Sequence, residues 1–309
     1  MISLRQLRYV DALARHRHFG QAAEAAGVTQ PALSMQIREL ENALGGALFE
    51  RTPAGAVPTP LGLDVAERAS RVLAEIADLE ALGQGERALA LNRLRLGVIP
   101  SIAPYLLPTL LPLVEEELPQ LRMSVREAVT DALVDDLAGG RIDVVIASLP
   151  LEQSGFVEEA AFIDEFFLAV PLGSPLAGLD SIAPSAVAAN ELILLEDGHC
   201  LRDQALSVCR RVDPAQLREF GASSMATILQ MVAAGHGVTL APRLCFEGDP
   251  AAASRRAVVP VEAPAPSRTG GLAWRRTSPG RARFGRVARL VARAGAGAGA
   301  RTGAGTGAD

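Results

Sequence analysis

The sequence contains no lysine, few cysteines and no apolar run long enough to cross a membrane. All 30 basic residues are arginine; a binding requirement would hardly exclude lysine everywhere, so we attribute this bias to the coding preference of the genome. No apolar stretch approaches the roughly 18 residues that a membrane span requires, and the N-terminus carries no signal-peptide pattern. We therefore expect a cytoplasmic protein with no membrane partner.

Only three cysteines occur among the 309 residues. In a reducing compartment this number excludes a structural disulfide framework, so any pairing among them would act as a switch. The apolar fraction of 49% and the charged fraction of 21% are ordinary for a chain that buries a core. The length favours about two domains.

The net charge of −5 is unevenly distributed. Residues 255–309 carry 11 arginines against Glu262 and Asp309, so this segment has a charge of +9 and the remainder of the chain −14. Residues 1–65 hold six arginines and six acids. Bulk electrostatics alone therefore do not indicate a nucleic-acid-binding segment at the N-terminus, whereas the residue pattern there does.

The first sixty residues carry the pattern of three short helices. Ser3 and Gln6 are spaced as a capping box for the first helix, and a second, alanine-rich helix is expected from Gly20 to Ala26. Thr29 would cap a third helix with Pro31 in its first turn, where a missing N–H costs little. The apolar positions of this third helix form one narrow stripe: Leu33, Ile37, Leu40 and Leu44.

A short helix, a tight turn and a helix with a polar outer face form the helix-turn-helix arrangement. In that arrangement the second helix enters the major groove, and its N-terminal side chains meet the edges of the bases. This interpretation assigns contacts with bases or phosphates to Gln30, Ser34, Gln36 and Arg38. The periodicity alone equally allows a three-helix packing unit whose exposed face is merely solvated.

Several motifs at fixed spacing resemble the DNA-binding signature of LysR-type transcriptional regulators. They are Thr29-Gln30-Pro31-Ala32-Leu33-Ser34, Gln36-Ile37, Leu40-Glu41, Leu44-Gly45, Leu48-Phe49-Glu50-Arg51 and Thr59-Pro60-Leu61-Gly62. The resemblance implies a winged helix-turn-helix over residues 1–62 that binds double-stranded DNA, at an operator with paired half-sites. The implied DNA contacts are Thr29, Gln30, Pro31, Ser34, Gln36, Arg38 and Arg51.

A long amphipathic helix follows, from Thr59 to about Gln84. Its apolar positions are Leu63, Ala66, Ala69, Val72, Leu73, Ile76 and Leu79. An exposed helix with so long a stripe needs a partner, which is either its own domain or, more simply, a second copy of the helix. In the resembled family this linker, here residues 63–90 with the hinge, is the dimer interface, and the family likeness further implies a tetramer.

Beyond the hinge, short apolar runs alternate with helical stretches, which predicts an α/β architecture. The expected strands are Leu94–Ile99, Met123–Glu127, Ile142–Ala147, Phe166–Val170, Leu192–Leu195 and Val238–Ala241. The expected helices are Tyr105–Glu117, Thr130–Leu137 and Ser224–Ala234. Ligand sites in such sheets lie beyond the carboxyl ends of strands, which points here to Pro100-Ser101 and Glu127–Thr130.

The family likeness implies a two-lobed, periplasmic-binding-protein-like α/β effector domain over residues 91–292. Lobe I is expected at about 91–163 and 268–292, and lobe II at about 164–267. Residues 293–309 are a glycine- and alanine-rich tail of low complexity without core residues. We expect this tail to be disordered.

The segment around Cys200 carries the most chemistry. The thiolate is the reactive form of cysteine, and positive neighbours or a helix N-terminus favour it. Cys200 has His199 and Arg202 beside it and follows Gly198, where a strand passes into a helix, and Cys209 lies nine residues on. The residues by themselves leave three interpretations open: two buried small apolar side chains, a zinc site, which the spacing disfavours, or a redox switch.

Residues Leu195 to Ala205 resemble, almost residue for residue, the sensing segment of a peroxide-responsive branch of the LysR-type family. In that branch hydrogen peroxide oxidises a first cysteine, a second cysteine resolves it to a disulfide, and a cellular thiol reductant resets the pair. The likeness implies that Cys200 is the peroxidatic residue and Cys209 the resolving one. On one continuous helix the two would lie about 13 Å apart. A disulfide needs Cα atoms within roughly 7 Å, so oxidation would have to refold the segment.

The same likeness implies a peroxide pocket. Ile99-Pro100-Ser101 and Pro104–Pro108 resemble the stretch whose hydroxyl residue faces the peroxide, with Ser101 in place of the usual threonine. The implied pocket comprises Ser101, Thr130, Gly198, His199, Arg202 and Gln204, and one of Arg268, Arg275 and Arg276 would join the switch. The chain departs from well-known relatives at Asp131 and Glu219, where those carry histidine. Negative charge there disfavours a thiolate, and the sequence leaves open whether it slows the peroxide reaction.

Together these features predict a regulator that senses hydrogen peroxide stoichiometrically and alters promoter binding or activation of oxidative-stress genes, with RNA polymerase as a partner. We expect neither turnover, nor a metal, nor a cofactor. The alternative is a LysR-type regulator that answers a small metabolite in the interlobe cleft. An enzyme of peroxiredoxin type is disfavoured, because such an enzyme would have no use for a DNA-binding domain and because the sequence contains no thioredoxin-like motif. Cys245 is expected to be a packed core thiol.

Overall fold

The computed structural model describes residues 1–53, 55–83, 93–187, 191–209, 217–218, 222–246, 255–278 and 280–300. The chain folds as two compact units. The first contains the described residues up to 83 together with Asp135–Arg141, and the second contains the other described residues. Within the described ranges no helix combines the length and the apolar character that a membrane crossing needs.

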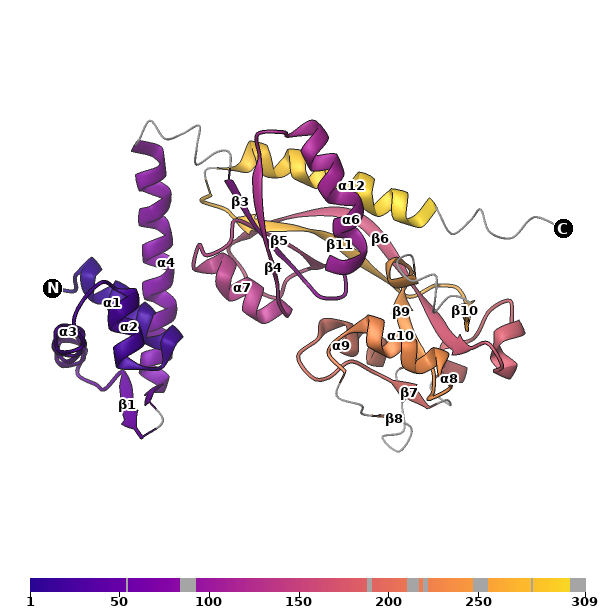
Figure 1. The fold of residues 1–309 in the computed structure, drawn as a ribbon, viewed down its shortest axis with the longest axis horizontal. Coiled ribbons are helices and arrows are strands. Elements are labelled where there is room, and N and C mark those ends of the chain that lie inside the picture. The colour runs from indigo at the N-terminus through magenta and orange to yellow at the C-terminus, as the bar shows by residue number, and fades with distance from the viewer. Residues whose placement is uncertain are drawn as a thin grey trace. The chain divides into compact units, whose positions relative to one another are not determined.

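The N-terminal unit consists of three short helices, a two-stranded hairpin and a long helix (Figure 1). These are α1 (Leu4–His16), α2 (Phe19–Ala25), α3 (Gln30–Leu44), β1 (Phe49–Thr52), β2 (Gly55–Pro58) and α4 (Pro60–Gly83). The predicted capping box is confirmed: the Gln6 N–H donates to Ser3 Oγ at 3.2 Å, and the Ser3 N–H donates to Gln6 Oε1 at 3.0 Å. Thr29 occupies the N-cap position of α3, although its side chain makes no capping hydrogen bond.

The apolar stripe of α3 faces a small core shared with α1 and α2. Leu33, Ile37 and Leu40 are fully buried in it, and Leu44 packs against its edge. Because these three positions recur every three or four residues, one face of α3 is buried and the opposite face is left to solvent. The sequence pattern predicted this division.

Helix α4 buries only part of its apolar stripe. Val65 and Ala66, near its start, pack against the core of the N-terminal unit. Further along, Val72 is 43% exposed and Leu79 is 65% exposed. The helix therefore packs on its own domain at its first turns, while large apolar side chains beyond them remain open to a partner.

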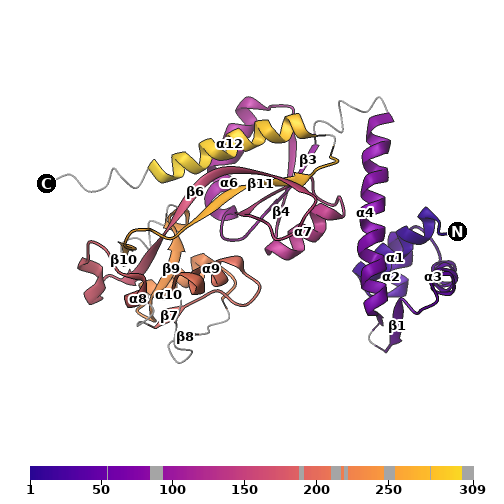
Figure 2. The same cartoon turned by 180° about the vertical axis from the view of Figure 1, so that it is seen from behind.

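The second unit is an α/β structure with two lobes on one continuous sheet (Figure 1, Figure 2). Its strands are β3 (Arg93–Val98), β4 (Arg122–Glu127), β5 (Val144–Leu149), β6 (Phe156–Pro171), β7 (Leu192–Ile193), β8 (Leu217–Arg218), β9 (Thr239–Pro242), β10 (Arg256–Pro260) and β11 (Ser267–Arg275). Its helices are α6 (Ala103–Glu117), η1 (Pro175–Gly178), α8 (Pro184–Val187), α9 (Cys200–Cys209), α10 (Met225–Ala233), η3 (Arg243–Phe246) and α12 (Arg281–Ala300), together with the first part of α7 (Thr130–Ala138), whose residues from Asp135 on are grouped with the first unit.

The strands of the large sheet follow the order β10-β6-β11-β5-β3-β4, and β9 also pairs with β6. Strand β3 is parallel to β4 and β5, whereas β11 is antiparallel to β5 and β6. The first part of β6 pairs with β11, and its last part, Phe166–Pro171, pairs with β9 and β10. Strands β6 and β11 therefore carry the backbone between the lobes, and the predicted architecture of a two-lobed α/β domain is confirmed.

The start of β6 and the length of α12 differ from the expectations, and β10 and β11 were not among the expected strands. Strand β6 begins at Phe156, ten residues before the expected Phe166. The apolar run Phe166–Val170 covers only its end, and its first half is mostly part-exposed. Helix α12 continues to Ala300, although we expected disorder from residue 293. Ala294 is buried, and a Cβ on Gly295 would lie only 2.7 Å from the Phe162 ring, so the absent side chain lets the helix lie directly on β6. The remaining tail, 301–309, lies outside the described residues.

Candidate functional site

Cys200 is the first residue of α9. The preceding Gly198 has a φ of 89°, a left-handed conformation that glycine adopts without strain, and it turns the chain from β7 into the helix. His199 is buried, and Leu201 and Ala205 anchor the helix in the core of the second lobe. Cys200 and Cys209 are the first and last residues of the same helix. On one continuous helix, nine residues apart, they are too far from each other to form a disulfide.

A small cavity lies beside the Cys200 side chain. It is lined by residues that follow β3, by the residues at the start of α7 and by the start of α9: Ile99, Pro100, Ser101, Val129, Thr130, His199, Cys200 and Leu201. Both strand ends singled out in the sequence therefore contribute to one pocket with Cys200. The cavity has a volume of about 10 Å³. This is close to the roughly 10–15 Å³ that a cavity needs to hold one water molecule.

Two hydroxyl groups belong to this pocket. The Ser101 hydroxyl is buried, and its oxygen accepts a hydrogen bond from Arg268 Nη1 at 2.7 Å. Thr130 Oγ1 is also buried, but among the described residues it has no hydrogen-bond partner. Leaving a buried hydroxyl unsatisfied costs roughly 1–3 kcal/mol. A small polar molecule in the cavity would supply the missing partner.

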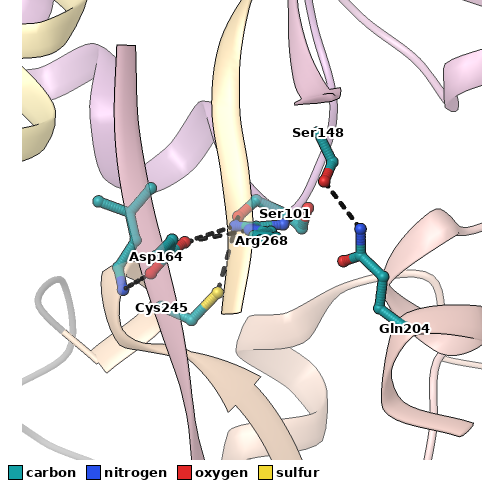
Figure 3. Close-up of polar contacts among 7 residues, drawn as sticks. Ser101, Ser148, Asp164, Gln204, Cys245 and Arg268 are labelled. Carbon is teal, nitrogen blue, oxygen red and sulfur yellow. Dashed lines mark hydrogen bonds and ion pairs between the residues drawn. The ribbon is translucent and has the colours of Figure 1, made fainter. Parts of the chain in front are cut away.

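Arg268 links the pocket to the crossing strands of the sheet (Figure 3). Its guanidinium, 1% exposed, donates to Asp164 Oδ2 from Nη2 at 2.9 Å and from Nε at 3.1 Å. Asp164 and Arg268 are directly opposite each other on β6 and β11. The other carboxylate oxygen of Asp164 accepts the Leu244 N–H at 3.0 Å. This buried ion pair is satisfied on both sides, as a stable buried pair requires.

The contacts of the three arginines that the sequence left open as members of the switch differ. Arg268 also donates from Nη2 to the Ser101 carbonyl at 3.1 Å, whereas Arg275 donates to the Ile142 carbonyl and Arg276 to the Phe156 carbonyl, each at 3.3 Å. Arg268 therefore reaches Ser101, a residue of the pocket, through two hydrogen bonds. Asp164 was missed by sequence reasoning; an acid between two apolar stretches of β6, residues 160–163 and 166–170, was an available signal.

Three other residues of the implied pocket do not line it. Arg202 pairs with Asp197 at 2.9 Å and donates to the Leu195 carbonyl at 3.0 Å, so it braces the loop before α9. Gln204 donates from Nε2 to Ser148 Oγ at 2.8 Å and thereby connects α9 to β5 (Figure 3). Gly198 contributes through its backbone conformation. The cavity itself is formed by the other members of the predicted set, Ser101, Thr130 and His199, together with Cys200.

Asp131 and Glu219 are the two acids that stand where well-known relatives carry histidine. Asp131 lies on α7 with an exposed side chain. Water and salt screen an exposed charge, so its effect on the thiolate is weakened. Glu219 lies outside the described residues.

Cys245 is fully buried in the core of the second lobe, as predicted. Burial raises the pKa of its thiol to about 12, although the nearby Arg268 guanidinium acts in the opposite direction. Its Sγ donates to the Ser101 carbonyl at a distance of 3.6 Å. Cys245 is therefore a neutral, packed thiol near neutral pH, which contrasts with the partly exposed Cys200.

The N-terminal unit presents the predicted DNA contacts on its surface. Five of the seven are exposed and the other two are half-buried; the exposed residues are Thr29, Gln30, Pro31, Arg38 and Arg51, and the half-buried ones are Ser34 and Gln36. The Arg51 guanidinium lies 4.2 Å from the centre of the Phe19 ring and donates to Ser34 Oγ at 3.1 Å. This bridge holds the hairpin against the start of α3 and leaves the arginine close to the helix that would enter the groove.

Two family models match the chain. Residues 4–63 match a model described as a bacterial regulatory helix-turn-helix protein of the lysR family, and residues 87–296 match the LysR substrate binding domain. The DNA-binding transcriptional dual regulator OxyR of Escherichia coli K12 is 38% identical over 94% of this chain and 95% of its own length. A probable hydrogen peroxide-inducible genes activator of Streptomyces viridosporus is 40% identical over 88% of each chain.

Solved structures agree with this relationship. A full-length OxyR variant from Pseudomonas aeruginosa superposes with a TM-score of 0.76 at 32% identity, over 94% of this chain and 95% of the other. A hydrogen-peroxide-bound OxyR mutant from Corynebacterium glutamicum has a TM-score of 0.63 at 33% identity, over 97% of each chain. The chain thus belongs to the LysR family of helix-turn-helix transcriptional regulators and, within that family, to the OxyR-like group.

Proposed function

We propose that this chain is a transcriptional activator that responds to hydrogen peroxide through oxidation of Cys200. The observation that carries the proposal is the cavity in which a partly exposed thiol meets two hydroxyl groups, one of them without a partner among the described residues. The names of the relatives, hydrogen peroxide-inducible genes activators, support the same signal. Stoichiometric oxidation of a regulator is sensing, so no enzymatic turnover is involved.

In the first step the Cys200 thiolate attacks one oxygen of hydrogen peroxide. A sulfur–oxygen bond forms and the oxygen–oxygen bond breaks; the departing hydroxide takes up a proton and leaves as water, and the sulfur is oxidised to a sulfenic acid. Hydrogen bonds from Ser101 and Thr130 would stabilise the charge that develops on the departing oxygen. Both residues line the cavity in which the peroxide would lie.

In the second step the Cys209 thiol attacks the sulfenic sulfur, and the sulfenic hydroxyl leaves as water to give a disulfide. Because both cysteines belong to α9, this bond requires the helix to unwind. The oxidised and reduced chains would then differ in the shape of the second lobe, which is how oxidation can reach the DNA. A cellular dithiol reverses the step and is itself oxidised to a disulfide.

The size of the cavity argues against a metabolite as its ligand. Pockets that hold metabolite-sized molecules measure roughly 300–1,000 Å³, whereas the Cys200 cavity accepts about one water-sized molecule. Hydrogen peroxide exceeds water by a single oxygen atom. The metabolite-responsive alternative would need a different pocket between the lobes.

We further propose that each of the three regions expected from the sequence has its own role. Residues 1–62 would bind double-stranded DNA, and residues 63–90 would pair two copies, since Val72 and Leu79 are exposed along α4. Residues 91–292 would sense the peroxide. Pairing places two DNA-binding heads on half-sites of one operator; assembly into a tetramer and contact with RNA polymerase complete the proposal.

Thiol trapping with mass spectrometry tests the redox step. Equimolar hydrogen peroxide should produce a Cys200–Cys209 disulfide, while Cys245 stays a free thiol because burial keeps it protonated. Before oxidation, an alkylating reagent should modify Cys200 in the native protein and reach Cys245 only after unfolding. If Cys200 oxidises no faster than Cys245, the proposed signal is wrong.

The DNA interface is tested at Arg38. Replacing Arg38 by alanine should weaken operator binding by about 1–3 kcal/mol if the guanidinium contacts a base in two places. Operator affinity at matched salt measures the effect, and the exposed Arg71 on α4, outside the predicted contacts, is a suitable control substitution. Unchanged affinity for the Arg38 variant would place this residue off the DNA.

A further inference from the structure

The direction of the Ser101 hydroxyl is set by its neighbour. Arg268 Nη1 donates to Ser101 Oγ at 2.7 Å. A guanidinium has no acceptor atom, and a hydroxyl has one proton to donate. The Ser101 proton therefore cannot point at Arg268. None of the hydrogen bonds found in the described ranges uses this hydroxyl as a donor, and Ser101 lines the Cys200 cavity.

Arg268 is itself held by Asp164. Two of its nitrogens donate to Asp164 Oδ2, and the carboxylate is fixed in turn by the Leu244 N–H. Both side chains are almost fully buried, 1% and 3% exposed, so neither has water to replace its partner. In Figure 3 Asp164, Arg268 and Ser101 form one connected row of polar contacts.

We propose that Asp164 is a positioning residue for the peroxide reaction: through Arg268 it orients the Ser101 hydroxyl as a hydrogen-bond donor into the Cys200 cavity. This inference rests on the function proposed above. The hydroxyl donates to the oxygen that leaves as water when the Cys200 sulfur attacks the other oxygen. Without the carboxylate, Arg268 loses its anchor, and the Ser101 proton is no longer directed at the cavity.

Asp164 and Arg268 also sit where the two strands that join the lobes pair with each other. Leu244 and Cys245, which contact this row, belong to η3 of the second lobe, whereas Ser101 follows β3 of the first. The orientation of the donor therefore depends on both lobes at once.

The experiment is a double-mutant cycle in the full-length protein, with the rate of Cys200 oxidation by hydrogen peroxide as the readout. Ser101→Ala removes the donor and should slow oxidation by about 10²-fold, the lower end of what loss of one preorganised donor costs elsewhere. Asp164→Asn should slow it to a similar extent. Combining the two should add nothing further, because Asp164 acts through Ser101. Ser101→Thr, which keeps a hydroxyl, should retain most of the rate.

Three controls separate positioning from general damage. Alkylation of Cys200 by iodoacetamide does not use the Ser101 hydrogen bond, so its rate should stay at the wild-type value in every variant. Asp143→Asn removes another carboxylate from an arginine pair, Arg95–Asp143, and should leave peroxide oxidation unchanged. If Asp164→Asn fails to fold, Asp164→Asn with Arg268→Gln removes both charges and should match the slow rate of Ser101→Ala.

Each outcome decides the inference. It is overturned if Asp164→Asn, or the neutral pair, oxidises at the wild-type rate, if the effects of Asp164→Asn and Ser101→Ala multiply, or if alkylation slows in parallel with oxidation. In those cases a wild-type Cys200 that still reacts with peroxide leaves the proposed function standing. A wild-type Cys200 that does not outpace Cys245 overturns the proposed function and this inference together.

Discussion

Replacing Cys200 by serine is expected to abolish the response to hydrogen peroxide while leaving operator binding intact. The serine hydroxyl is nearly the same size as the thiol but is not a nucleophile near neutral pH, so the sulfenic acid cannot form. Cys200 belongs to the second compact unit, whereas the predicted DNA contacts lie in the first. The loss should therefore be confined to the response.

Two measurements check this expectation. Operator affinity of the reduced protein should match the wild type, and the change that peroxide produces in promoter activation should disappear. Ser207→Ala provides the matched control, since it changes an exposed side chain on the same helix, α9, and leaves Cys200 in place. A Cys200→Ser protein that still responds to peroxide would show that the signal enters elsewhere.

Asp164→Ala is expected to lower the free energy of unfolding by about 3–5 kcal/mol, the largest stability effect among these substitutions. The substitution leaves the Arg268 guanidinium, which is 1% exposed, without a negative charge beside it. It also leaves the Leu244 N–H without the carboxylate that accepts it. Removing one member of a buried pair costs far more than the intact pair contributes, because the remaining charge is not solvated.

Urea unfolding monitored on the second unit measures the loss. Asp143→Ala is the matched control, because it breaks a pair in which Arg95 is about half exposed. That control should lose about 1 kcal/mol or less. A loss of similar size for Asp164→Ala would mean that water reaches Arg268 and that the pair is not a fixed element of the site.

The sequence was informative where the functional residues are close together along the chain. The helix-turn-helix signature and the segment around Cys200 are each one continuous stretch of sequence, so fixed spacing alone identified them. The apolar period of α3 likewise predicted which face is buried. The strand ends at Ser101 and Thr130 followed from a general rule of α/β sheets, and both border the cavity.

Elements that depend on distant neighbours were missed or misjudged. The first half of β6 is mostly part-exposed and is interrupted by Glu158 and Glu159. Its strand pairing comes from β11, more than a hundred residues away. Helix α12 extends into a glycine- and alanine-rich segment because Gly295 fits against the Phe162 ring. Composition favoured disorder there, and packing against β6 outweighed it.

By itself the sequence determined the family, the α/β class of the effector half and the pair of cysteines proposed to react, since each depends on local pattern or on a long contiguous motif. Tertiary structure alone decided which arginine reaches the pocket and that Asp164 holds it. Those contacts join residues 104 and 167 positions apart. No local spacing encodes them, because a buried charge finds its partner through the register of β6 against β11 and the burial that register creates.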